Sequence, residues 1–569
     1  MFRICLTLAL LLPGDESPAA TSQAVPPSVG DETARLIALV TDAAELVRVR
    51  GEAAFPGFRI DGSRWRQGES YIFVLDLQGN MLVHPDSTLE GRNQLELRDV
   101  NGKPIIRGLL GAASSVPGRA EGWYHYEWPV PGGLLPRWKS SYVRLVTAPS
   151  GARYVVGSGA YNDRMERVFV EDAVHRAVAE VEQRGTAAFP LFHDRAGSFL
   201  MKDAYIFVVD MAGVELVNPA FPNLEGRNLL ELKDAEGKPL VRAMLDMVRA
   251  HESGWVDYMW PKPGESVPTR KSTFVRMART DGRQVLVGCG VYLADAPRAA
   301  GRTPTLTASE LMTLVRDGAE VLGQRGESAY ADFRARGSRW FRNGTYFFVW
   351  SMEGRRIFNA AIPEGEGLDV RELTDIHGRP IGRMILEVAA SPAGEGWIHY
   401  LYPEPGNIFP TWKSTFLRRV TFPSGTQYVV GSGVYNMQMD RAFVEDIVRR
   451  AAGLVAEQGR GAFPLLRDRT GPFVFMDTYI FVESPDGMEL VNAAQPSLEG
   501  RNLMDVRDVN GKALVREYVT AAMKDGSAWV EYYWYKPGDN IPARKLAYVR
   551  KVQSGGETFI VGSGLYPDE

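Results

Sequence analysis

The sequence predicts an α+β fold that is repeated four times along the chain. Short sequence strings recur in the same order, each recurrence opens with a helical hydrophobic pattern, and short β-type segments follow it. Strands outnumber helices in each repeat and the connections are short. We therefore expect each repeat to be a long N-terminal helix packed on an antiparallel sheet of about five strands.

The recurrent strings define four modules. The string Tyr-Ile-Phe-Val or a near variant begins at Tyr71, Tyr205, Tyr346 and Tyr479, and a closing Gly-Ser-Gly-x-Tyr string or near variant begins at Gly157, Gly288, Gly431 and Gly562. The predicted boundaries are 31–162 for module one, 163–294 for module two, 307–436 for module three and 437–569 for module four, with a Pro/Gly-containing linker at 295–306. Each module has about 130 residues, enough for its own hydrophobic core.

The modules are related in pairs. Ser63-Arg-Trp65 of module one recurs at Ser338 in module three, and Phe169-Val-Glu-Asp172 of module two recurs at Phe443 in module four. This pattern indicates a duplicated pair. Tyr161 and Tyr435 lead almost directly into helical stretches, near Asp163 and Met437. We expect two rigid pairs joined by a looser middle.

Each predicted element has a local cause. In module two, apolar residues from Val168 to Val181 recur at helical spacing, and Gly185 then provides a left-handed stop, as Gly51, Gly326 and Gly459 do in the other modules. In module one, the strands 71–75 and 81–83 form a hairpin around Gly79, and a short helix follows Lys103. Three further strands are predicted at 123–128, 140–146 and 154–156.

The composition excludes some classes of function. Hydrophobic residues make up 45% and charged residues 24% of the chain, with a net charge of −4, so no basic nucleic-acid footprint is present. There are two cysteines. Cys5 lies in a predicted leader, which leaves Cys289 without an internal disulfide partner, and we interpret it as a buried structural thiol.

The N-terminus has the pattern of a secretory signal. A short charged start, an apolar run from Ile4 to Leu12 and small residues up to Ala24 predict a signal peptide at 1–24. The mature protein is then periplasmic or secreted, with no transmembrane segment, because no later stretch has the 18 or more apolar residues of a membrane helix. The alternative is a disordered N-terminus on a cytosolic protein.

The repeated strings resemble those of the Cache family of extracellular sensor domains, type 2 forms in particular. In module two they are Leu224-Glu-Gly-Arg-Asn, Asp234-Ala-Glu-Gly-Lys, Gly254-Trp-Val-Asp-Tyr, Trp260-Pro-Lys-Pro, Lys271-Ser-Thr-Phe and Val287-Gly-Cys-Gly-Val-Tyr. The resemblance implies PAS-like modules with a small pocket between sheet and loops. It also implies ligands such as acetate, propionate, lactate or pyruvate. Most such domains are ectodomains of chemoreceptors or kinases. No membrane helix, signalling coiled coil or kinase follows here, which leaves a membrane receptor or signalling protein as an expected partner.

Strand alternation selects the candidate ligand-binding residues. One strand face carries aromatic residues that are either core or pocket wall: Tyr126, Trp128, Tyr258, Trp260, Tyr400, Tyr532 and Trp534. The opposite face varies in chemistry (His125, Asp257, His399 and Glu531), and we expect it to be solvated.

The next strand begins with a recurrent lysine, namely Lys139, Lys271, Lys413 and Lys545. An inward lysine favours a bound carboxylate, whereas a lysine at a strand edge would reach water or a local acid. His84 and Asn218, with Asn359 and Asn492, are candidates for a pocket rim or for turn caps.

Other recurrent polar residues have structural interpretations. Arg144, Arg276, Arg418 and Arg550 are predicted to form structural ion pairs. The Glu-Gly-Arg-Asn and Asp-x-x-Gly-Lys strings are typical of turns, because glycine accepts positive φ and aspartate binds backbone amides. Calcium binding is disfavoured, because the acids lack the dense spacing of a calcium loop.

No catalytic constellation is evident. The seven histidines share no position across the four modules, and the Gly-Ser-Gly strings are not a nucleophile elbow. We predict no enzymatic activity, no metal and no cofactor. The sequence favours an exported small-molecule-binding protein of the sensor type, with a short monocarboxylate as the expected ligand. The alternative is an extracytoplasmic scaffold that binds a protein partner through its repeated domains.

Overall fold

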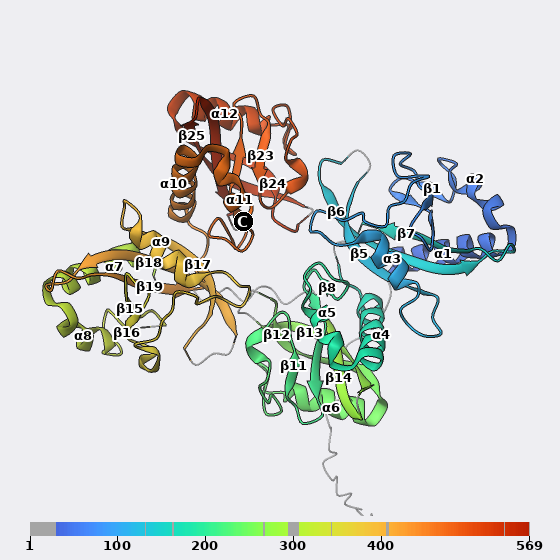
Figure 1. Ribbon diagram of the computed structural model, residues 1–569, viewed down its shortest axis with the longest axis horizontal. Helices are drawn as coiled ribbons and strands as arrows, with labels where there is room; N and C mark the ends of the chain where they lie inside the picture. The colour runs from blue at the N-terminus through green and yellow to red at the C-terminus, as the bar shows by residue number, and fades with distance from the viewer. Residues whose placement is uncertain are drawn as a thin grey trace, which may run out of the picture.

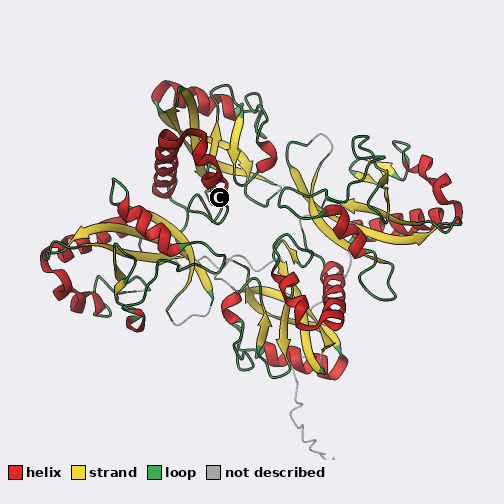
Figure 2. Ribbon diagram, viewed as in Figure 1, coloured by secondary structure: helices red, strands yellow, loops and turns green. Residues whose placement is uncertain are grey.

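The computed structural model describes residues 30–130, 133–161, 164–263, 265, 268–280, 282–293, 306–342, 344–405, 409–539 and 541–567. It contains four α+β modules in chain order (Figures 1 and 2), which confirms the predicted fold class. The predicted signal peptide at 1–24 and most of the predicted linker at 295–306 lie outside the described residues. Among the helices that are described, none is both long enough and apolar enough to cross a membrane.

A long helix opens each module, as predicted. These helices are α1 (Asp31–Arg50), α4 (Arg167–Arg184), α7 (Ala308–Arg325) and α10 (Arg441–Gln458). Each is followed by a glycine, and Gly185 has φ 61° and ψ −142°, so φ is positive but ψ lies outside the left-handed helical region. Helix α10 starts four residues later than the predicted Met437, because the Asp440 side chain accepts a hydrogen bond from Ala442 N and caps the helix there.

Each module has one five-stranded antiparallel sheet. In module one the order across the sheet is β4 (Met81–Val83), β3 (Phe73–Asp76), β7 (Arg153–Ala160), β6 (Pro136–Thr147) and β5 (Glu121–Pro129). The equivalent orders are β11-β10-β14-β13-β12, β16-β15-β19-β18-β17 and β23-β22-β26-β25-β24. In the same order, the strands of module two span Glu215–Val217, Phe207–Asp210, Arg283–Tyr292, Pro268–Thr280 and Ser253–Pro261. Those of module three span Arg356–Asn359, Phe347–Ser351, Gln427–Tyr435, Pro410–Thr421 and Glu395–Pro403. Those of module four span Glu489–Asn492, Phe481–Glu483, Glu557–Leu565, Pro542–Ser554 and Ser527–Tyr535. The strand that carries the recurrent lysine is therefore flanked on both sides and is not an edge strand.

The two faces of each sheet are covered by different helices. The long helix packs on one face, and a short helix packs near the other: α3 (Ile105–Ala112), α6 (Leu240–His251), α9 (Ile381–Ala390) and α12 (Leu514–Asp525). Separate buried clusters form on the two faces in modules one and two, and the cluster under the short helix contains the candidate tyrosines Tyr126 and Tyr258. The short helix and its connecting loops therefore close the candidate pocket.

The recurrent loop strings form turns, as predicted. Asp99 Oδ1 accepts hydrogen bonds from Asn101 N and Lys103 N, and its Oδ2 accepts from Glu127 N in the neighbouring strand. In the other string, Glu90 accepts from His84 N at 3.0 Å, and Gly91 has φ 76°. These bonds fix the loops against the sheet, with His84 at the junction.

The expectation of a solvated strand face is wrong in modules one and three. His125 and His399 are 1% and 2% exposed, because Phe169 or Phe443 from the long helix of the following module packs on the ring, with centroids 4.9 and 4.7 Å apart. Each histidine shares a hydrogen bond with a serine on the neighbouring strand. Asp257 is exposed, as predicted for this face in module two.

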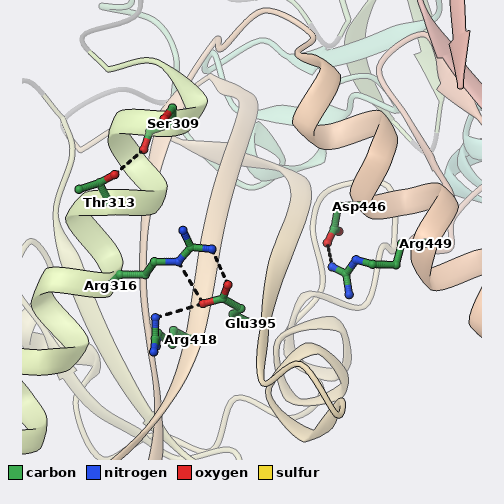
Figure 3. Close-up of polar contacts among 7 residues, drawn as sticks. All are labelled: Ser309, Thr313, Arg316, Glu395, Arg418, Asp446 and Arg449. Atoms are coloured by element: carbon green, nitrogen blue, oxygen red, sulfur yellow. Dashed lines mark hydrogen bonds and ion pairs between the residues drawn. The ribbon is translucent and has the colours of Figure 1, made fainter. Parts of the chain in front are cut away.

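Two of the recurrent arginines form the predicted ion pairs. Arg144 pairs with Glu121 at 3.1 Å, and in module three Glu395 lies between Arg418 of β18 and Arg316 of α7, as Figure 3 shows. Arg276 instead donates to His175 of α4. The contacts of Arg316 and Arg276 attach the long helix to its own sheet, whereas the Arg144 pair joins β6 to β5.

Contacts also connect the two pairs. Arg469 and Arg501 of module four donate to Asn101 Oδ1 and Leu134 O of module one, at 2.7 and 2.8 Å. Between modules two and three, the Phe409 ring lies 4.8 Å from the Trp260 ring. In Figure 1 module four accordingly lies beside module one, although they are the most distant in sequence.

Candidate ligand-binding site

A buried lysine is the centre of the candidate site in every module. Lys139, Lys271, Lys413 and Lys545 are at most 1% exposed. Each lysine lies within a strand that is flanked on both sides, and its side chain passes over a glycine of the neighbouring strand. A Cβ on Gly159 would lie 2.5 Å from Lys139 Cε and 2.4 Å from Ser141 Oγ. The second glycine of the closing string therefore leaves the space through which the lysine reaches the candidate pocket.

Two tyrosines enclose each ammonium group. In module one, Lys139 Nζ lies 4.0 Å from the Tyr71 ring centroid and 5.1 Å from that of Tyr161, within the range of cation–π attraction. The equivalent pairs are Tyr205 and Tyr292, Tyr346 and Tyr435, and Tyr479 and Tyr566. These tyrosines belong to the first and last recurrent strings, so both strings contribute a ring that packs against the lysine in every module.

The lysine retains unused hydrogen-bond donors. An ammonium group has three N–H donors, and in module one the Tyr71 hydroxyl accepts from Lys139 Nζ at 2.8 Å, which is its one acceptor among the described residues. In module three Lys413 Nζ donates to the hydroxyls of Tyr346 and Tyr435 at 2.9 and 3.3 Å, and in module four Lys545 Nζ donates to that of Tyr479 at 3.0 Å. In module two, Lys271 Nζ has no acceptor within the described part of the chain. Such donors are suited to the oxygens of an anion.

Burial weakens the positive charge of these lysines. It lowers the pKa of Lys139 and of Lys545 to about 7, and that of Lys271 to about 8, because the ammonium form loses its hydration. Nearby acids oppose this effect only in part: Glu69 acts on Lys139, and Asp477 and Glu489 act on Lys545. A bound carboxylate would restore the charged form.

Small cavities lie beside the lysine in three modules. The cavity of module four is lined by Tyr532, Trp534 and Lys545, and that of module three by Tyr400 and Lys413. The cavity of module two is lined by Asn218, Tyr258 and Trp260, but Lys271 is not in its wall. Their volumes are about 20, 30 and 20 Å³, room for roughly one or two waters. A larger ligand therefore requires the walls to move.

In module one the candidate residues occupy the equivalent positions. Tyr126 and Trp128 have ring centroids 5.8 Å apart, and the His84 ring lies 6.0 Å from Trp128 and 5.1 Å from Tyr71. Burial beside Lys139 lowers the pKa of His84 to about 4, so this histidine is neutral at neutral pH. The structure thus brings His84, Tyr126, Trp128 and Lys139 close together.

The predicted rim residues have two contacts at once. Asn218 Oδ1 accepts from Phe221 N at 2.9 Å, which caps a turn, and its Nδ2 donates to Glu215 Oε1 at 2.8 Å inside the pocket. Asn492 has the same arrangement, with Gln495 N and Glu489. Each asparagine therefore caps a turn and also contacts a buried glutamate beside the cavity.

Sequence reasoning missed a charged position in the pocket wall. Glu215 and Glu489 are buried, and burial raises the pKa of Glu215 to about 8 and that of Glu489 well above its usual range. The equivalent residue is Met81 in module one and Arg356 in module three. The available signal was a charged residue in a strand at a position that is apolar in module one.

Comparisons with known proteins agree with the repeated architecture. A family model described as a Cache domain matches residues 59–166, 195–440 and 442–569. The methyl-accepting chemotaxis protein McpP of Pseudomonas putida is 31% identical over 93 residues, which are 16% of this chain and 17% of that protein. The sensor histidine kinase MctS of Rhizobium johnstonii is 32% identical over 93 residues, 16% of this chain and 20% of that protein. The matched segment thus spans about a fifth of each curated relative.

Similar solved structures include three bacterial sensor domains. A periplasmic sensor domain of a chemotaxis protein is 32% identical, with 22% of this chain and 88% of that chain covered and a TM-score of 0.19. A methyl-accepting chemotaxis protein from Vibrio parahaemolyticus is 27% identical, with 22% and 86% covered and a TM-score of 0.20. A Cache chemosensory domain described in terms of carboxylic acid recognition is 26% identical, with 22% and 91% covered and a TM-score of 0.20.

Proposed function

Because the chain belongs to the Cache domain family, we propose that it is an extracytoplasmic small-molecule-binding protein of the sensor type, whose modules bind small carboxylates. The observation that carries this proposal is the enclosed lysine, which recurs in all four modules between two tyrosine rings. A buried ammonium group with unused donors is costly unless a partner engages it. A carboxylate supplies both charge and acceptors.

What is known of similar proteins supports a sensor role and, in one case, the same class of ligand. One similar domain is described by its carboxylic acid recognition, and the curated relatives are a chemotaxis protein and a sensor kinase. On this proposal the protein reports binding through a membrane receptor or signalling partner. It acts without catalysis.

A thermal-shift and calorimetric screen of the whole protein tests the proposal. Acetate, propionate, lactate and pyruvate are the probes, because a ligand at 100 times its dissociation constant stabilises the native state by about 2.7 kcal/mol. We expect one acid to raise the melting temperature, and one of the four lysine-to-methionine variants to abolish the shift. The exposed Lys233→Met is the matched control. Absence of a shift with every acid, in folded protein, contradicts carboxylate binding.

A second candidate function is a scaffold for a protein partner. The observation that favours it is the small volume of the cavities, about 20 to 30 Å³, which is less than an acid of four heavy atoms needs. The two functions differ in the effect of Lys→Met. A scaffold would keep its protein partner after this substitution, whereas a carboxylate-binding module would lose its ligand.

A further inference from the structure

One pocket position carries a chemically different residue in different modules. Strands β4, β11, β16 and β23 begin with Met81, Glu215, Arg356 and Glu489, each three residues before His84 or the equivalent asparagine. In the second and fourth modules, the glutamate accepts a hydrogen bond from that asparagine. In module three the same position carries a cation, so its pocket is electrostatically distinct.

Arg356 is buried and lacks an ion-pair partner. It is 8% exposed and lines the same cavity as Lys413, whose wall contains no acidic residue. Among the described residues, no carboxylate lies within ion-pair distance of either cation, and Arg356 Nε has no hydrogen-bond acceptor. Two cations in one enclosed cavity repel each other and both lose hydration. Binding of an anion removes both penalties.

A second substitution in module three makes room for Arg356. The loop residue before the recurrent glutamate is Leu224 in module two and Leu498 in module four, but Gly365 in module three. A Cβ on Gly365 would lie 2.2 Å from Arg356 Nη1. Gly365 is not among the residues with positive φ, so its backbone does not require glycine. The Arg356 side chain instead occupies the space that a Cβ at this position would take, so the arginine and the glycine form a matched pair.

From this pair we propose that module three binds a small dianion, such as a short dicarboxylate or a phosphate ion, between Arg356 and Lys413. The inference rests on the proposed function, because it takes these cavities to be ligand sites. The guanidinium group supplies paired donors for one set of oxygens, and the ammonium group supplies donors for the other. In modules two and four the glutamate at the Arg356 position supplies no positive charge for a second anionic group.

The test is calorimetry on the whole protein with malonate, inorganic phosphate and acetate at neutral pH. We compare the natural chain with Arg356→Met, which introduces the residue found at this position in module one. Exposed Arg355→Met is the neighbouring control. We expect Arg356→Met to weaken dianion binding by about tenfold or more, as loss of a charge-assisted contact does, and Arg355→Met to leave it unchanged. Malonate and phosphate, titrated separately, distinguish a dicarboxylate site from a phosphate site.

Three outcomes separate this inference from the proposed function. If acetate binds but the affinity for malonate and for phosphate is the same with and without Arg356, the proposed dianion site is wrong while carboxylate binding stands. If no anion binds at all, both the dianion site and the proposed function fail.

The melting temperature without ligand provides a second readout: Arg356→Met should raise it, because an unpaired buried charge is removed. A decrease, together with unchanged dianion affinity, would assign Arg356 a structural role. Gly365→Leu, which restores the residue of modules two and four, should weaken dianion binding as Arg356→Met does.

Discussion

Asp172 of module two accepts a hydrogen bond from the backbone N–H of Trp123 in module one, at 3.2 Å. The carboxylate is 2% exposed and also pairs with Arg176 at 2.9 Å. Asp446 has the equivalent contact with Trp397 N at 3.4 Å and pairs with Arg450. The aspartate of the Phe-Val-Glu-Asp string therefore joins each second module to the module before it.

Asp172→Ala should destabilise the first pair of modules by about 3–5 kcal/mol, because it leaves Arg176 as an uncompensated buried charge and removes the acceptor of Trp123 N. The measurement is urea unfolding followed by tryptophan fluorescence. Gln183→Ala, at an exposed position of the same helix, is the control and should change stability little. If both variants unfold at the same urea concentration, the aspartate does not stabilise the joint.

The buried Lys139 should make stability depend on pH. Its pKa is about 7 in the folded state and about 10.4 in an unfolded chain, so the unfolded state binds more protons between these values. Stability should therefore rise with pH from about 7 towards 10, by up to about 1.4 kcal/mol per pH unit for this one group. Below pH 7 the full penalty of the charged lysine remains.

Comparison of Lys139→Met with the natural chain isolates that contribution. Glu215, with a pKa of about 8, acts in the opposite direction, because its stabilising proton is lost as the pH rises from its unfolded value through 8. Both chains contain Glu215, so its effect cancels in the difference. Urea unfolding at a series of pH values should show a smaller rise for the variant above pH 7. Parallel curves would contradict a buried, weakly basic lysine.

Gly159→Ala should displace the lysine of module one. The added Cβ would lie 2.5 Å from Lys139 Cε, and overpacking of this kind costs about 1–3 kcal/mol. Gly111→Ala in helix α3 is the control, since its Cβ would meet no atom within 4 Å, and it should be neutral or stabilising. Thermal unfolding of both variants is the measurement. Equal melting temperatures would show that the closing glycine is not needed for the lysine.

The sequence predicted the fold class of the repeated modules because their signals are local and repeated. Helical periodicity, stop glycines and β-type strings depend on neighbours in the chain, and repetition reduced the ambiguity of any one copy. The fate of His125 could not be predicted in this way, because the residue that covers it, Phe169, belongs to the next module. Strand alternation identifies two faces but does not say which other domain covers one of them.

The candidate site was predicted only in part, for a related reason. Alternation placed Tyr126 on an aromatic strand face but left Lys139 either inward or at a strand edge, and in the structure both side chains are buried. The enclosing Tyr71 precedes β3 and Tyr161 follows β7, and these two strands are far apart in the chain but adjacent in the sheet, so the convergence of the tyrosines depends on the sheet order. The charged position of Glu215 was missed because a single acidic residue in a strand has no periodic signal.

The last prediction concerns the size of the pocket in module two. Met244 of α6 is buried and lines a cavity of about 20 Å³, so Met244→Ala should enlarge it and cost about 2–5 kcal/mol of stability. If the cavity is a carboxylate site whose volume limits the ligand, the variant should bind butyrate better relative to acetate than the natural chain does. Met247→Ala, on the same helix but only half-buried, is the control. Calorimetric titration of both acids gives the ratio. An unchanged ratio, in a variant that is still folded, would mean that the ligand lies elsewhere, because added space beside a bound acid favours the longer chain.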